Sequence, residues 1–277
     1  MADKQLNSTL KSMDTEEWLD VHFTRPIGLA FALFWNKFDV HPNVITIISI
    51  FLGMGAGWMF HYPDLQSNLW GVILLMFANF CDSTDGKKTL MGRMLDGFSG
   101  DVWFACIYVA ICVRLMDEPM PFIDRPWGIW IWVLCSITGF FCHSRQSSLA
   151  DYYRQIHLLF LKGKKGSELD TYAQQRGIYE ALPKHGEWFK RLFYYNYANY
   201  CKSQEKRTPR FQSFFDKIHA TYGDAESIPE TLRDEFLQGS RPLMKHTNML
   251  SFNLRAIVLY ITCLANCPWV YFLFELT

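Results

Sequence analysis

Five long apolar runs constrain the fold of this chain more than any other feature of its sequence. They span residues 44–60, 69–81, 102–113, 127–142 and 256–274. A helix that crosses a bilayer needs roughly 20 apolar residues, so the shorter runs would also suit buried helices of a soluble core. The number of runs, their low internal charge and the Trp and Tyr residues near their ends favour the membrane alternative. The sequence therefore predicts an all-α, polytopic membrane bundle in which five spans are visible.

Basic residues are distributed unevenly among the segments that connect these runs. Residues 61–68, after the first run, contain no Lys or Arg, and residues 114–126, after the third run, contain only Arg114 and Arg125. All other Lys and Arg lie before the first run, between the second and third runs, or after the fourth. Because Lys and Arg accumulate in cytoplasmic segments, we expect the N-terminus and the loop 86–93 to be cytoplasmic.

The composition divides the chain into four parts. Residues 1–40 predict a polar tail and an amphipathic helix over 16–38 that lies in the membrane interface, although soluble amphipathic helices show the same pattern. Residues 41–147 contain the first four spans and the candidate catalytic residues. Residues 148–250 are polar and too long for a simple connection, and they predict a cytoplasmic helical insert. Residues 251–277 contain the fifth span.

Four aspartates lie where the second apolar run ends and the third begins. Asp82 and Asp85 are three residues apart, which places them on one face of a helix, and Asp96 and Asp101 follow shortly after. Carboxylates held this close repel each other unless some bind protons, and a divalent cation removes that problem. Oxygen ligands favour Mg²⁺, Mn²⁺ or Ca²⁺. The alternative is that these aspartates cap helices or lie on a loop surface.

The stretch CDSTDGKKTLMGRMLDGFSGD resembles the signature of the CDP-alcohol phosphotransferase family, D-x2-D-G-x2-A-R-x8-G-x3-D-x3-D. Asp82, Asp85 and Gly86 match the first part of that signature, and Gly92 and Asp96 match the next part. The segment HPNVIT, before the first run, also resembles the family's entry into its first transmembrane helix. The resemblance covers the first four spans, and it implies a bundle of six transmembrane helices.

The loop inside the motif departs from the signature. Only KKTLM separates Gly86 from Gly92, which is seven residues fewer than in the family and omits the Ala-Arg pair. Lys87 and Lys88 would have to replace that Arg, although Lys lacks the bidentate fork of a guanidinium.

The spacing of the last aspartate is a second departure. Asp101 follows Asp96 by five residues, where the family has four. On a regular helix this spacing separates the two residues by about 140°. We therefore expect an irregular backbone between Gly97 and Gly100 that brings Asp101 back to the other aspartates.

The resemblance implies an activity as well as a fold. The family transfers a phosphate-linked group from a CDP-alcohol to an acceptor hydroxyl in phospholipid synthesis and releases CMP. It implies Mg²⁺ or Mn²⁺, as two ions, held by Asp82, Asp85, Asp96 and Asp101. It implies CDP-alcohol binding by Asp82, Asp85, Gly86 and Gly92, and catalysis by Asp96 and Asp101, the latter as metal ligand, general base or both. It also implies an integral membrane homodimer in contact with lipid, with its active site at the cytoplasmic face and no nucleic-acid partner.

Four basic residues near the motif are candidates for binding an anionic acceptor such as inositol phosphate or glycerol phosphate, and inositol itself is a further candidate acceptor. They are His143, Arg145, Lys88 and Arg93. The alternative is that these residues anchor helix ends on the cytoplasmic side. Two other functions also stay open. One is transfer of an ethanolamine or choline headgroup from its CDP form to a lipid hydroxyl, and the other is cation transport by membrane carboxylates. The motif disfavours transport, because transport carboxylates lie near the bilayer midplane.

Overall fold

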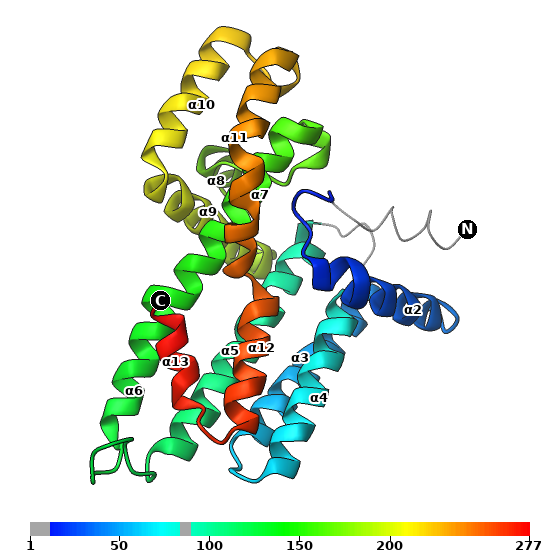
Figure 1. Ribbon diagram of the computed structural model, residues 1–277. Helices are drawn as coiled ribbons and strands as arrows, with labels where there is room; N and C mark the ends of the chain where they lie inside the picture. The colour runs from blue at the N-terminus through cyan, green and yellow to red at the C-terminus, as the bar shows by residue number, and fades with distance from the viewer. Residues whose placement is uncertain (1–11, 84–89) are drawn as a thin grey trace. The chain divides into compact units, whose positions relative to one another are not determined.

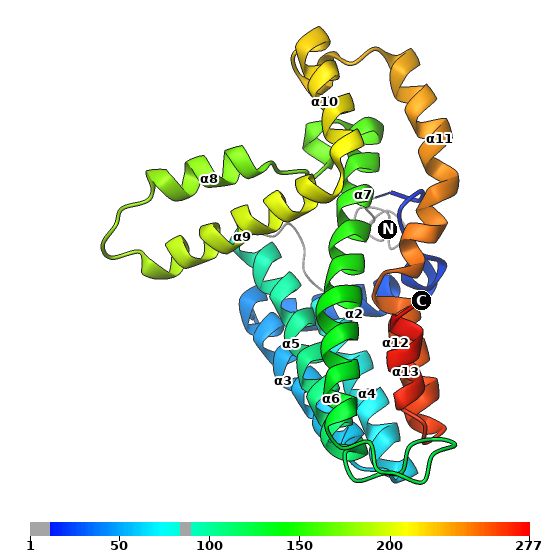
Figure 2. The ribbon, with the colours of Figure 1, turned by 90° about the vertical axis from the view of Figure 1, so that its left-hand side faces the viewer.

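The computed structural model describes residues 12–83 and 90–277, with their side chains except those of residues 90–97 and Ala225. Throughout these residues the regular structure is helical, apart from one isolated β-bridge between Pro119 and Pro126. The chain divides into two compact units. The first comprises the described residues up to Gln146 together with Met249–Thr277, and the second is Ser147–Asn248. Figures 1 and 2 show the path of the chain through both units.

The first unit begins with two helices at the N-terminus, continues through a bundle and is completed by two C-terminal helices. Its elements are the π-helix η1 (Asp20–Thr24), α2 (Arg25–Asn36), α3 (Pro42–Phe60), α4 (Leu65–Asp82), α5 (Leu90–Leu115), α6 (Ile129–Ser136), the π-helix η2 (Ile137–His143), the first turn of α7 (Ser144–Lys162), α12 (Phe252–Leu264) and α13 (Trp269–Glu275).

Three helical stretches in the described chain are long and apolar enough to cross a membrane. They are Pro42–Phe60, Phe98–Leu115 and Glu230–Leu264, the last of which runs from the second unit into α12. Together with the absence of strands from the described elements, these stretches confirm the predicted all-α membrane bundle.

Small residues let α3 pack closely against α5. A Cβ atom at Gly57 would lie 3.1 Å from the backbone carbonyl carbon of Cys106, and one at Gly53 would lie 2.0 Å from the indole ring of Trp103. The spacing of the two glycines is the GxxxG pattern that brings helix backbones together in membranes. Packing at this interface therefore fixes the position of α5, which carries half of the predicted aspartates.

A buried arginine ties several segments together at the C-terminal end of α5. The Arg114 guanidinium donates to the carbonyl oxygen of Phe60 and to Oδ1 of Asn68, both at 3.1 Å, and also to Oδ1 of Asn266. These bonds satisfy a charge that would be costly to bury alone. They join the end of α3, the start of α4 and the turn after α12.

The fifth apolar run does not form the single span that we expected. It folds into α12 and α13, separated by a tight turn in which Asn266 has a φ of +57° and the Cys267 amide donates to the Thr262 carbonyl at 2.8 Å. Pro268 lacks an amide hydrogen and would clash with the preceding turn of a continuous helix. Figure 1 shows α13 folding back beside α12, so this region contributes two helices of opposite direction.

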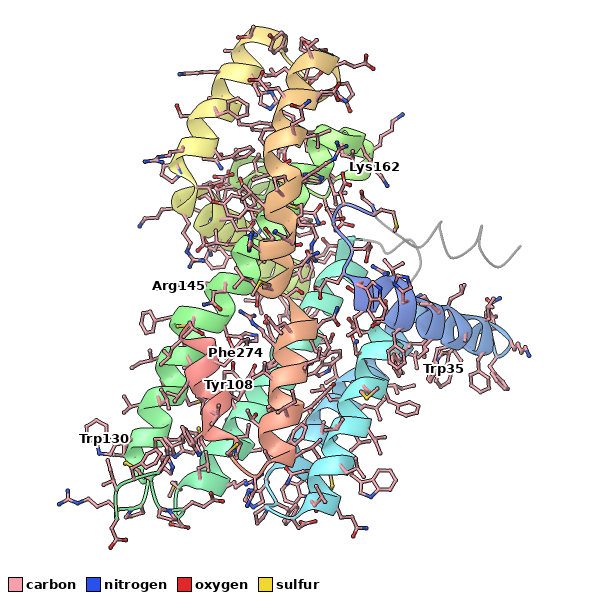
Figure 3. The ribbon with its side chains drawn as sticks, viewed as in Figure 1. Trp35, Tyr108, Trp130, Arg145, Lys162 and Phe274 are labelled. Carbon is pink, nitrogen blue, oxygen red and sulfur yellow. The ribbon has the colours of Figure 1, made fainter. Side chains whose placement is uncertain are left out.

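The N-terminal segment is helical without a break through η1 and α2, within the range where we expected an amphipathic helix. Phe31 of α2 packs against Phe77 and Phe80 of α4, with ring centroids 5.8 and 6.1 Å apart. The same segment leaves several large apolar residues exposed: Trp18, Phe23, Leu33, Phe34 and Phe38. Figure 3 shows Trp35 on the same helix. The exposed aromatic surface is typical of a helix that lies in a membrane interface.

The second unit is a helical subdomain with its own core. Its elements are the rest of α7, the 3₁₀-helix η3 (Lys164–Gly166), α8 (Tyr172–Ala181), α9 (Trp188–Arg207), α10 (Pro209–Tyr222), the 3₁₀-helix η4 (Ala225–Ser227) and α11 (Glu230–Met249). In the core, the ring of Phe160 from α7 stacks on that of Phe236 from α11 at 3.9 Å. Tyr152, Leu159, Ile218 and Leu237 surround this pair.

Candidate active site

Asp82 is the predicted metal ligand that the structure describes most fully. It is the last residue of α4 and is half-buried. The hydroxyl of Ser99, buried on α5, donates to its Oδ1 atom at 3.0 Å. This bond joins the C-terminal end of α4 to the N-terminal half of α5. The end of α4 that carries Asp82 therefore contacts α5, the helix that carries Asp96 and Asp101.

The backbone around Asp101 is regular, and our expectation of an irregular segment there was wrong. The helix α5 continues without a break from Leu90 to Leu115. Regular geometry places Asp101 about 160° from Ser99, the residue that contacts Asp82. Gly97 and Gly100 both lie within this helix.

The remaining motif residues are described only in part. Asp85, Gly86 and Lys88 lie outside the described residues, and Gly92, Arg93 and Asp96 lie in α5 with side chains that also fall outside them. Within the described side chains, no group of three His, Cys, Asp or Glu residues is arranged to hold a metal ion. The grouping of the four aspartates therefore stays a prediction.

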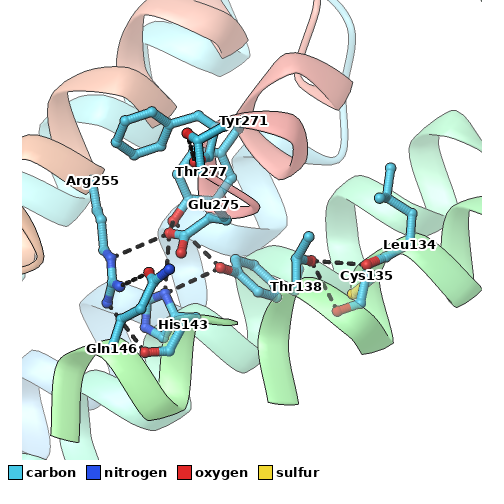
Figure 4. Close-up of polar contacts among 11 residues, drawn as sticks. Leu134, Cys135, Thr138, His143, Gln146, Arg255, Tyr271, Glu275 and Thr277 are labelled. Carbon is cyan, nitrogen blue, oxygen red and sulfur yellow. Dashed lines mark hydrogen bonds and ion pairs between the residues drawn. The ribbon is translucent and has the colours of Figure 1, made fainter. Parts of the chain in front are cut away.

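His143 lies in a buried polar network inside the first unit (Figure 4). Its Nδ1 atom is 3.1 Å from Oε1 of Glu275 and 3.1 Å from the hydroxyl of Tyr108. A carboxylate only accepts hydrogen bonds, so Nδ1 carries the proton in the contact with Glu275. The Tyr271 hydroxyl donates to the same Oε1 atom at 2.6 Å.

Arg255 completes this network. Its Nε atom is 3.4 Å from Oε1 of Glu275, and the side chains of both residues are almost fully buried, at 3% and 0% exposure. Its guanidinium also donates to Oε1 of Gln146 at 2.8 Å and to the backbone carbonyl of His143 at 3.4 Å. The network thus links η2, the start of α7, α12 and α13 around one buried carboxylate.

The network lies close to one of the predicted catalytic residues. The ring of Phe104 on α5 is 4.4 Å from the ring of His143. Asp101 precedes Phe104 by three residues, which places both on one face of α5. Asp101 therefore shares a helix face with residues that contact the network.

Of the predicted acceptor-binding residues, the structure describes the side chains of two. His143 is buried and held by the contacts above. Arg145 is exposed at the start of α7, with its guanidinium 4.8 Å from the ring centroid of Phe141, and Figure 3 labels its position. The structure does not bring the two side chains into one pocket. Their roles in acceptor binding stay predictions.

The sequence reasoning missed Arg255 and Glu275. A signal was present, because ionisable residues at the edges of an apolar run are rare and usually have partners. Because residues 251–277 were expected to contain a single membrane span, no partners were predicted for these two charges.

Comparison with known proteins identifies a family for part of the chain. Residues 39–157 match the sequence model of the CDP-alcohol phosphatidyltransferase family. No curated protein and no solved structure matches the chain. The matched segment contains α3, α4, α5 and their aspartates, and it ends within α7. Over these residues, which are less than half of the chain, the sequence is similar to the CDP-alcohol phosphatidyltransferase family.

Proposed function

We propose that this protein is an integral membrane enzyme that transfers a phosphatidyl or other substituted phosphate group from a CDP-alcohol to an acceptor hydroxyl and releases CMP. The observation that carries the proposal is the family match over the segment that contains the aspartate motif. The bond between Ser99 and Asp82 supports it, because it joins the two helices that carry the motif. The same match disfavours cation transport.

The donor atoms available in the motif suit Mg²⁺ or Mn²⁺. Asp82 ends α4 and Asp96 lies near the start of α5, and carboxylate oxygens are the ligands that these hard cations prefer. We propose that Asp82, Asp85 and Asp96 hold two such ions together with the pyrophosphate of the CDP-alcohol. Bound divalent cations neutralise charge on a phosphoryl group and on its leaving group. The Ser99 hydroxyl orients the Asp82 carboxylate for this task.

A carboxylate must also accept the proton of the attacking hydroxyl. Asp96 and Asp101 are the candidates. On the regular helix α5, position 96 lies about 60° from Ser99, whereas Asp101 lies about 160° away. The position of residue 96 on the Asp82 side of α5 supports Asp96 as the base, through the carboxylate oxygen that does not bind metal, and leaves Asp101 as the second candidate.

The acceptor is the least constrained part of the proposal. Arg145 is exposed at the start of α7 and follows His143 by two residues, and a guanidinium binds phosphate through paired hydrogen bonds. We propose an anionic acceptor such as inositol phosphate or glycerol phosphate, used by a homodimer whose site faces the cytoplasm. Inositol and the headgroup transfer from CDP-ethanolamine or CDP-choline are the competing reactions.

The test is CMP release by the purified protein in proteoliposomes, measured with a panel of CDP donors and acceptors. We expect release with Mg²⁺ or Mn²⁺, none with EDTA, and loss of donor binding together with turnover in Asp82→Asn. Asp117→Asn is the matched control, since Asp117 is an exposed aspartate just after α5. Failure of every donor and acceptor pair in the presence of metal would refute the activity, and full activity in Asp82→Asn would refute the metal assignment.

A further inference from the structure

The second unit carries a helical hairpin with an unusual surface. Its helices α8 and α9 are packed against each other and joined by residues 182–187. Figure 2 shows the hairpin projecting away from α10 and α11 of the same unit. The last turn of α8, the joining segment and the first part of α9 form its free end, which we call the hairpin tip, residues 178–195.

The base of the hairpin is fixed by buried contacts. Ala198, Cys201 and Gln204 are buried along the C-terminal half of α9, and the Gln204 side chain donates to the Ser148 carbonyl of α7 at 2.9 Å. The hydroxyl of Tyr197 donates to Asp170 at 3.0 Å. These contacts fix the base of the hairpin to the rest of the second unit.

The tip is also ordered internally. A guanidinium nitrogen of Arg191 donates to the Leu182 carbonyl at 2.7 Å and to the Tyr179 carbonyl at 3.5 Å, which satisfies carbonyls at the C-terminal end of α8. The same guanidinium lies 4.5 Å from the ring centroid of Tyr179. Arg191 therefore holds the joining segment in place, and its charge is already used in contacts within the hairpin.

Large apolar side chains are exposed along one face of this tip. Trp188, Leu192 and Tyr195 follow each other at intervals of four and three residues, which places them in one stripe of α9. Trp188 is 71% exposed and Leu192 is 52% exposed, and Phe189 beside them is 56% exposed. An ordered stripe of this kind is typical of a surface that binds something apolar.

The charge of the hairpin is strongly positive. Residues 172–207 contain seven Lys and Arg and three Glu, whereas the whole chain has a formal net charge of zero. Lys184 and Lys190 lie in the tip itself and are exposed, and Lys190 also pairs with Glu187 at 2.6 Å. Exposed Trp, Phe and Tyr combined with Lys match the chemistry of a bilayer interface, where the rings lie among the headgroups and Lys meets anionic lipid.

We propose that the hairpin tip docks onto the surface of a bilayer that contains anionic lipid. The occupant is lipid, because the second unit joins the first at both of its ends, at residues 146–147 and 248–249, and the first unit is the membrane bundle. A surface tethered in this way meets lipid at high effective concentration. Docking would give the enzyme a third contact with its membrane, beyond the spans and the N-terminal aromatic surface.

The experiment uses the full chain in proteoliposomes of phosphatidylcholine, with or without 30% phosphatidylglycerol. The photoreactive residue p-benzoylphenylalanine replaces Trp188 or Phe189, and mass spectrometry identifies the adducts. Tyr222 on α10, an exposed aromatic residue of the same unit, is the control position. We expect lipid adducts at 188 and 189, and none at 222.

The basic residues are tested in the same system. Lys184→Gln with Lys190→Gln should lower the adduct yield in the vesicles with phosphatidylglycerol by up to roughly fivefold for each lysine. The yield in pure phosphatidylcholine should not change. Adducts that join two copies of the chain, or equal lipid adducts at 189 and 222, would overturn the proposal. Equal yields for the lysine variant and the parent in both vesicles would overturn the role given to the lysines.

Discussion

Removing Arg255 should destabilise the first unit strongly, because it would leave the buried Glu275 carboxylate without its cationic partner. The two side chains are 3.4 Å apart and almost inaccessible to solvent. At an effective dielectric constant of about 20, charges at this distance attract by roughly 5 kcal/mol. In the Arg255→Met variant, Glu275 keeps its contacts with His143 and Tyr271. We therefore expect the free energy of unfolding to fall by about 3 kcal/mol, the lower end of the range for breaking a buried ion pair.

A double-mutant cycle separates the pairwise energy from the loss of packing. Glu275→Gln should also lower the free energy of unfolding by about 3 kcal/mol, because it removes the carboxylate charge that lies 3.4 Å from the buried Arg255 guanidinium. The double variant removes both charges. Its free energy of unfolding should therefore fall by far less than the sum of the two single decreases, with a coupling energy of up to about 3 kcal/mol.

Equilibrium unfolding in mixed detergent micelles, followed by circular dichroism, measures these free energies. The control is the exposed pair Arg176–Glu180, whose atoms are closer, at 2.7 Å. Arg176→Gln should produce little change, since solvent screens exposed pairs. Additivity of the two buried substitutions within about 0.5 kcal/mol, or an Arg255→Met variant as stable as the control, would refute the reasoning.

Three further predictions concern the base, a buried thiol and the orientation in the membrane. Asp96→Asn should lower turnover by about 10²-fold or more, while Asp101→Asn should retain most of the turnover. Steady-state CMP release measures both. The opposite pattern would assign the base role to Asp101. Burial, with help from Asp170, raises the pKa of Cys201 to about 12, so its thiol should stay unmodified by N-ethylmaleimide at pH 8 until the protein is denatured; mass spectrometry of the intact folded protein checks this, and rapid labelling would contradict it. A cysteine placed at position 65 should react only with reagent added from the side opposite to the motif, and labelling from the cytoplasmic side would reverse our orientation.

Much of the fold follows from local sequence patterns. Apolar runs set the places of α3, α4 and α5 because each run buries its backbone polar groups within its own helix. Local sequence signals also mark where two of these helices, α3 and α4, begin. Pro42 follows the capping residue His41, and Asp64 accepts a hydrogen bond from the Ser67 amide at 2.8 Å. The aspartate motif is local too, because it depends on residue spacing alone.

Contacts between distant residues are not visible in such patterns. The turn at Asn266 depends on the Arg114 guanidinium from α5 as well as on Pro268, so an apolar run that reads as one span becomes two helices. The bulge that the spacing of Asp96 and Asp101 led us to expect is absent as well, because α5 is one continuous helix from Leu90 to Leu115.

The sequence by itself determined that this chain is a helical membrane protein and that Asp82, Asp85 and Asp96 carry the family's motif. Only the tertiary structure decided the partners of Glu275. Arg255 lies 20 residues before Glu275, and His143 lies on η2. A buried charge must be neutralised by whatever the fold brings within hydrogen-bond distance, and this depends on how α12, α13 and η2 pack, which no local pattern records.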